Sequence, residues 1–129
     1  MTEPQQPKNR TMIDRAFAER FAKEWIEVWN AHDLNAILSH YADDVVFHSP
    51  RIAQVMGERI DRVAGKPALA RYWGKALANA KDLHFTFDRL YLGSDSLTIA
   101  YRNHRGQHAA ETFVSDGRGL VKESVATYA

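Results

Sequence analysis

The sequence predicts an α+β protein in which three helices come first and a mainly antiparallel β-sheet comes last. Apolar residues recur at helical spacing in the first part of the chain, and from Leu83 onward this period changes to two. Turn residues then divide the last third into four short segments. With 129 residues, the chain has close to the commonest size of one domain, and we expect that domain over residues 11–129.

The first helix is expected over residues 12–31, because large apolar side chains recur every fourth position along one face. These are Ile13, Phe17, Phe21, Trp25 and Trp29. Thr11 followed by Asp14 resembles a capping box and would begin this helix. Asp33 can cap a second, short helix over residues 34–40, and the residues at 42–44 then break the helical period.

A strand and a third helix are expected in the middle of the chain. Val45 to His48 are β-branched or aromatic and predict a short strand that ends at Ser49-Pro50. Residues 51–64 show no clear period, so we expect a flexible connection in which 59–61 could form a second short strand. Gly65-Lys66-Pro67 opens the third helix, with Leu69, Trp73 and Leu77 on its apolar face.

The last third predicts a four-stranded meander, with turns at Gly93-Ser94, Arg105-Gly106 and residues 116–119. If these loops contain an even number of residues, opposed side chains share a face of the sheet. One face then combines rings, small residues and polar groups: Phe85, Phe87, Ala100, Arg102, His104, Glu111, Phe113, Ser124, Ala126 and Tyr128. The other face is more apolar, with Leu90, Leu97, Ile99, Tyr101, Ala110, Val114, Val121 and Val125.

The helices are expected to cover the face that holds Arg102 and Glu111, and a second copy of the chain would cover the other face. A dry ion pair between these two residues would cost several kcal/mol of desolvation, so we expect them to pair inside a pocket. His104 would lie near its rim. Glu111, Arg102 and His104 are therefore candidate catalytic residues. The alternatives are a structural ion pair and, for His104, a solvated loop histidine.

Composition excludes several other classes of function. A net charge of +1 gives no field that would recruit nucleic acid or anionic lipid, and the chain contains no cysteine. Residues 1–10 predict a disordered tail rather than a signal peptide, and no apolar stretch is long enough to span a bilayer, so we expect a cytoplasmic protein. His104 and His108 have ligand-like spacing, but the expected hairpin separates them, and no phosphate- or dinucleotide-binding motif occurs. Neither a metal nor a cofactor is expected.

The segment WNAHDLNAILSHYADDVVFHSP, residues 29–50, resembles the signature of the nuclear transport factor 2-like superfamily, which includes ketosteroid isomerases and SnoaL-like polyketide cyclases. The order of elements is similar over roughly residues 12–128. The resemblance implies a cone-shaped barrel of three N-terminal helices packed on a curved sheet, usually a dimer through the outer sheet face. Members include isomerases, dehydratases, epoxide hydrolases, cyclases and binding modules without catalysis.

The resemblance also places three residues at positions known in ketosteroid isomerases. Trp25 takes the place of their oxyanion-hole tyrosine, Glu111 that of their protonated aspartate, and Ser49 that of their general-base aspartate. Because serine cannot abstract a carbon-bound proton, the usual isomerase machinery is not expected. An arginine beside a carboxylate instead resembles the epoxide hydrolases, which use two acidic groups; Asp61 is an unplaced second candidate.

We therefore expect a pocket for a hydrophobic small molecule that bears a polar group. Its wall would consist mainly of rings: Trp25, Trp29, Phe47, His48, Ser49, Tyr72, Phe85, Phe87, Phe113 and Tyr128. Any chemistry would be cofactor-free isomerisation, cyclisation, dehydration or epoxide opening, with Glu111 as acid or base and Arg102 stabilising negative charge. The alternative is a ligand-binding or dimerisation module without turnover.

Overall fold

The computed structural model describes residues 13–57 and 59–129, and it confirms the α+β class. The element order is α1 (Arg15–Asn30), α2 (Leu34–Leu38), β1 (Tyr41–His48), α3 (Ile52–Met56), β2 (Arg62–Ala64), α4 (Lys66–Asn79), β3 (Thr86–Leu92), β4 (Ser96–Arg102), β5 (His108–Ser115) and β6 (Val121–Tyr128). The expected tail and Thr11 lie outside the described residues. Within the described ranges, no helix is long and apolar enough to cross a membrane.

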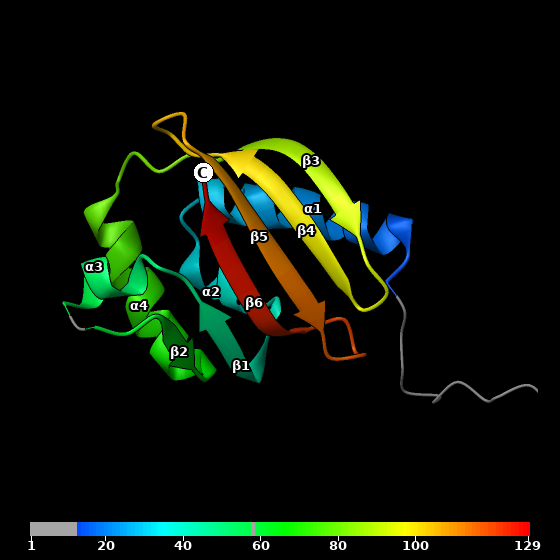
Figure 1. Ribbon diagram of the computed structural model, residues 1–129, viewed down its shortest axis with the longest axis horizontal. Coiled ribbons are helices and arrows are strands. Elements are labelled where there is room, and N and C mark those ends of the chain that lie inside the picture. Colours follow the sequence, from blue (N-terminus) through cyan, green and yellow to red (C-terminus); the bar gives the residue numbers. More distant parts are fainter. Residues whose placement is uncertain (1–12, 58) are drawn as a thin grey trace, which may run out of the picture.

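The strands form one sheet in the order β2-β1-β6-β5-β4-β3. β1 and β6 run parallel, and every other neighbouring pair is antiparallel. The sheet is curved and remains open, and α1 lies across its concave side (Figure 1). α3, α4 and β2 lie together at one end of the sheet (Figure 1). The predicted four-stranded meander is present as β3 to β6.

The core lies between α1 and the inner face of the sheet, and rings dominate it. Phe21 meets Phe113 edge to face at 5.0 Å between ring centroids, and Trp25 meets the same ring at 5.3 Å. Trp25 also stacks on Phe85 at 5.5 Å, and Trp29 meets Trp73 of α4 at 5.1 Å. The side chains predicted from their spacing to face the core from α1 therefore hold the helix against the sheet.

Two side chains fix the ends of α1. Asp14 caps its start, since its carboxylate accepts a hydrogen bond from the Phe17 amide at 2.8 Å; the cap thus lies three residues later than Thr11 would place it. At the other end, Asn30 forms hydrogen bonds with both backbone groups of Phe85, at 2.7 Å to its N–H and 3.0 Å to its carbonyl. Asp33 caps α2 as predicted.

The structure corrects the boundaries in the middle of the chain. The residues predicted to break the helical period, 42–44, belong to β1, whose pairing with β6 is irregular between Tyr41 and Val46. The expected flexible connection over 51–64 is wrong, because its described part contains α3 and β2, and the short strand expected at 59–61 lies at 62–64 instead. α3 has only five residues and ends at Gly57, where φ is 73°, so it is too short to show a helical period.

The loop lengths also differ from the prediction, with a consequence for the site. Leu92 pairs with Leu97 across a four-residue loop, which keeps the expected parity, although a bulge between Phe87 and Arg89 shifts the start of β3. Arg102 pairs with His108, so the next loop contains five residues, 103–107, and the parity is reversed. The loop at 116–120 is also odd, but a bulge at Lys122 restores the expected parity for most of β6.

The inner face of β4 is therefore the opposite of the one predicted. Leu97, Ile99 and Tyr101 are buried inside, opposite Phe113, Glu111 and Ala109 of β5. Ala100 and Arg102 lie on the outer face. The predicted grouping of Glu111 with Phe113, Ser124, Ala126 and Tyr128 is correct.

Candidate functional site

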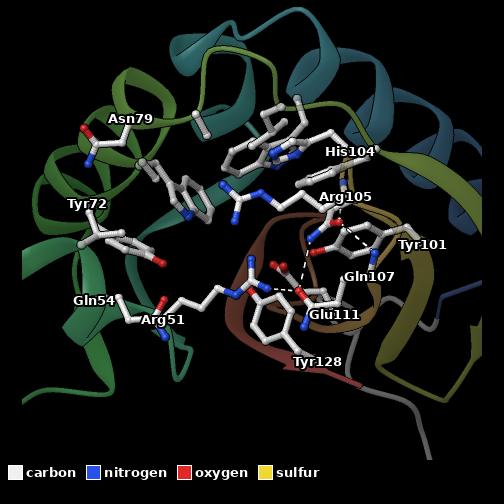
Figure 2. A pocket seen from close by; sticks show the side chains of 18 of the residues that line it. Arg51, Gln54, Tyr72, Asn79, Tyr101, His104, Arg105, Gln107, Glu111 and Tyr128 are labelled. Atoms are coloured by element: carbon white, nitrogen blue, oxygen red, sulfur yellow. Dashed lines mark hydrogen bonds between the residues drawn. The ribbon is translucent and has the colours of Figure 1, made fainter.

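A cavity of about 590 Å³ opens between the inner face of the sheet and the helices α3 and α4 (Figure 2). This volume is in the range of small-molecule sites. Rings, two arginines and several amide side chains form its wall: Trp25, Trp29, Phe47, Pro50, Arg51, Gln54, Val55, Tyr72, Trp73, Ala76, Asn79, Ala80, Leu83, Phe85, Tyr101, Asn103, His104, Arg105, Gln107, Glu111 and Tyr128. Six of the rings expected there, Trp25, Trp29, Phe47, Tyr72, Phe85 and Tyr128, are among them.

Glu111 is the buried carboxyl group of this wall. It lies on the inner face of β5 and is 4% exposed. The Ser124 hydroxyl donates a hydrogen bond to Glu111 Oε2 at 2.7 Å. Burial raises the pKa of Glu111 from 4.5 to about 7, and the hydrogen bond from Ser124 opposes only part of this rise. Both the protonated and the ionised forms are therefore available near neutral pH.

Three phenol groups surround this carboxyl group. Burial raises the pKa of Tyr72 to about 12, and burial also raises the pKa values of Tyr101 and Tyr128. The Glu111 carboxylate adds to each rise, whereas the Arg51 cation opposes it. The phenols thus stay protonated and can donate hydrogen bonds. Tyr101 is the freest donor, because its hydroxyl has no hydrogen-bond partner among the described residues.

The residues at the ketosteroid isomerase positions are engaged with the protein itself. Trp25 Nε1 donates a hydrogen bond to the Tyr41 hydroxyl at 3.1 Å. Ser49 is 2% exposed and lies behind the wall, where its hydroxyl lowers the pKa values of Tyr72 and Tyr128 and accepts from the Arg51 amide at 3.2 Å. Neither side chain presents a free acid or base to the cavity.

Arg51 enters the cavity from the start of α3. Its guanidinium group lies 3.9 Å from the centre of the Tyr128 ring and donates a hydrogen bond to Gln107 Oε1 (Figure 2). Arg105 and Gln107 come from the five-residue loop between β4 and β5. Asn103 orders this loop, since its side-chain oxygen accepts from the amides of Arg105 at 2.9 Å and Gln107 at 3.0 Å.

His104 lies in the cavity wall, as expected for a residue near its rim. Its side chain is 15% exposed, and Nε2 is 3.5 Å from Asp82 Oδ1. This contact is close enough for an ion pair when the ring is protonated, but neither ring nitrogen has a hydrogen-bond partner of good geometry within the described part of the chain.

The predicted ion pair between Arg102 and Glu111 is wrong. Arg102 points to the outer face, where Nε donates to Asp88 Oδ1 at 3.2 Å. The reason is the 103–107 loop, because its five residues in place of the expected two reverse the face of every β4 side chain. Arg102 therefore has no part in the cavity.

Three expected wall residues also lie elsewhere. His48 is on the outer side of β1, with Nε2 2.9 Å from Glu123 Oε2. Phe87 is 45% exposed on the edge strand β3 and does not line the cavity. Phe113 is buried between Phe21 and Trp25, behind the cavity. Asp61 is exposed and is not in the wall.

Sequence reasoning missed Arg51, Tyr101, Arg105 and Gln107. Tyr101 was assigned to the outer face by the loop length, and Arg51 lies in a segment without a period. One signal was available: Asn103 is a favoured turn residue, and a loop that begins there and includes Gly106 has five residues rather than two. Within the described ranges, no cluster of three or more histidine or acidic side chains could hold a metal ion.

Comparison with known proteins places this fold in a family. The SnoaL-like domain model matches residues 22–127, so the chain belongs to the SnoaL-like family. A SnoaL-like protein of unknown function from Burkholderia thailandensis is 45% identical, with a TM-score of 0.85 over 92% of this chain and 99% of that chain. A search among curated proteins gives no match.

More distant structures share the fold. A nuclear transport factor 2-like protein from Mesorhizobium loti is 19% identical, with a TM-score of 0.69 over 91% of this chain and 95% of that chain. A ketosteroid isomerase-like protein from Kribbella flavida is 16% identical, with a TM-score of 0.67 over 88% of this chain and 78% of that chain. These structures show the shared fold, and the predicted SnoaL-like membership is confirmed by the family model over residues 22–127.

Proposed function

We propose that the cavity binds a hydrophobic small molecule and that Glu111 transfers a proton on it without a cofactor. The observation that carries this proposal is a carboxyl group that is buried in a cavity wall and has a pKa of about 7. A group with a pKa near the ambient pH can both accept and donate a proton efficiently. Isomerisation, cyclisation, dehydration and epoxide opening are the reactions within its reach.

The hydroxyl of Tyr101 would meet the oxygen of such a substrate. It lines the same cavity as Glu111, lies on β4 two positions beyond Ile99, which pairs with Glu111, and has no hydrogen-bond partner among the described residues. A donor that is already in place when negative charge develops on the substrate oxygen stabilises the transition state. Tyr101 therefore takes the role that the sequence assigned to Arg102.

A second candidate is ligand binding without turnover. It is favoured by the two ketosteroid isomerase positions, because Trp25 is hydrogen-bonded to Tyr41 and Ser49 lies against two tyrosines. The cavity wall then contains one acidic group, Glu111. Family members that use two acidic groups would need a second one in this wall.

Titration of Glu111 together with a substrate panel separates the two candidates. Carboxyl NMR should give a pKa near 7 for Glu111. An enzyme should turn over a member of a panel of ketones, epoxides and polyketide-like esters, and Glu111→Gln should lower its kcat by about 10²- to 10⁴-fold.

Glu27→Gln is the matched control, since Glu27 is exposed on α1 and its carboxylate pairs, among the described residues, with Lys23 alone, at 4.0 Å. It should leave turnover unchanged. An ordinary pKa for Glu111, with no product from any compound of the panel, would favour binding alone.

A further inference from the structure

Two arginines in the cavity wall are not needed for the proposed proton transfer. Arg51 comes from the start of α3, and Arg105 comes from the loop between β4 and β5. Figure 2 shows their side chains extending into the middle of the cavity from opposite walls. Arg51 is half-buried there, whereas Arg105 remains exposed to solvent.

Neither guanidinium group is neutralised by the protein. Other arginines do find carboxylates, such as Arg102 with Asp88 and Arg118 with Asp116. No ion pair of this kind involves Arg51 or Arg105 among the described residues. Two like charges in one cavity repel each other more strongly than in bulk water, because the effective dielectric constant is lower there.

The nearby acidic groups do not cancel these charges. The carboxyl group of Glu111 is engaged by Ser124 at 2.7 Å, and Asp82 lies 3.5 Å from His104, outside the wall. The remaining polar groups at the rim, those of Gln54 and Asn79, are uncharged amides. The cavity therefore combines two cations with an apolar, ring-lined interior.

One of the two guanidinium groups is held in place by side chains, and the other residue is anchored through its backbone. The Tyr128 ring and the Gln107 amide fix the guanidinium group of Arg51, and Asn103 fixes the backbone of Arg105. A cation positioned before binding loses little side-chain entropy when it meets an anion.

We infer that the ligand of this cavity is a hydrophobic carboxylic acid whose carboxylate is bound by Arg51 and Arg105 while its apolar body lies among the rings. The planar guanidinium fork matches the carboxylate geometry, and one anion between two arginines relieves their repulsion. The inference rests on the proposed ligand pocket and narrows its substrate class.

A pair of probes that differ only in charge tests this inference. Cyclohexylbutyrate and its uncharged amide, cyclohexylbutyramide, have the same apolar body. The three tryptophans of the chain, Trp25, Trp29 and Trp73, all line the cavity, so their fluorescence reports binding. We expect the carboxylate to bind about tenfold more tightly than the amide.

Arginine variants identify the source of this preference. Arg51→Gln and Arg105→Gln should each reduce it, and the double variant should remove it, whereas amide binding should stay within about twofold. Arg89→Gln removes the same charge from the exposed outer face of β3 and should leave the preference unchanged. Raising the salt concentration should reduce the difference in affinity between the two probes for the wild-type protein. This measurement does not depend on whether a variant folds.

Equal affinities for the two probes, or a preference that survives in the double variant, would overturn the inference. Absence of saturable quenching by both probes would also overturn it. A Glu111 pKa near 7 in the same preparation would leave the proposed acid/base role standing, so the two failures can be told apart.

Discussion

Glu111 owes its near-neutral pKa to burial and not to a second acid. Its only hydrogen bond from a side chain of the described residues comes from Ser124, and burial outweighs the stabilisation that this bond gives to the ionised form. A buried, protonated carboxyl group next to phenols tolerates a dry environment better than an ionised one. The same feature that prepares Glu111 for proton transfer must then affect folding stability.

The free energy of unfolding should fall as pH rises between 4.5 and about 7. In this window the unfolded chain ionises Glu111 and the folded protein keeps it protonated, so the folded state binds more protons. A pKa raised from 4.5 to about 7 corresponds to a loss of about 3 kcal/mol once the pH exceeds the folded pKa. Urea unfolding at a series of pH values measures this loss.

Glu111→Gln isolates the contribution of this one group. The amide has nearly the same shape and can still accept from Ser124, but it does not titrate. The difference in stability between wild type and variant should therefore change with pH across the window and be constant outside it. Parallel stability curves for the two proteins would show that Glu111 titrates normally.

At the scale of elements, the cavity depends on how the end of α1 is joined to the start of β3. Asn30 forms two hydrogen bonds with the backbone of Phe85, and the Phe85 ring then packs on Trp25 and Trp29 in the cavity wall. These side-chain bonds replace the sheet hydrogen bonds that Phe85 lacks, because it precedes the first residue of β3.

Asn30→Ala should lower the free energy of unfolding by roughly 1–3 kcal/mol, since it leaves two backbone groups of Phe85 without partners. Urea denaturation gives the change. Asn35→Ala is the matched control: Asn35 is exposed on α2, and its side chain makes no hydrogen bond in the described part of the chain. If both variants lost the same stability, the two hydrogen bonds between Asn30 and Phe85 would have no special role.

The elements themselves could largely be predicted from sequence, but the faces of the strands could not. Helical spacing identified α1 and α4, and alternation identified the meander. Side-chain direction depends on the parity of each loop, and a loop of five residues at 103–107 in place of two exchanged Tyr101 with Arg102. Around Asp116 two deviations cancelled, because an odd loop was followed by a bulge at Lys122, so Glu111 was placed on the correct face.

The site was harder to predict than the fold for a related reason. Glu111 and most rings lie on regular elements with a visible period, whereas Arg51, Arg105 and Gln107 lie in loops or at the start of a one-turn helix. Only tertiary structure brings such residues together, as the bond between Arg51 and Gln107 across 56 positions of sequence shows.

At the scale of the whole molecule, the sheet has one covered face and one uncovered face. The helices cover the inner face, and residues on the outer face alternate with the core along β4 and β5. Its middle is formed by a row of cross-strand neighbours on β3, β4, β5 and β6, namely Tyr91, Thr98, Thr112 and Val125. Polar side-chain pairs flank this row, with Arg102–Asp88 on one side and His48–Glu123 on the other.

The expected homodimer through this face stays a prediction, but its test must change. Ile99, which the sequence placed outside, is 0% exposed in the core, so an arginine there would unfold the chain rather than dissociate a dimer.

Val125 is 37% exposed on the outer face and is the appropriate position. In a two-fold dimer, Val125→Arg would place two like charges in the same small interface, so sedimentation velocity should show monomers. Asn35→Arg, on exposed α2, should remain dimeric. A wild-type protein that sediments as a monomer, or a Val125→Arg dimer, would exclude the outer face as the interface.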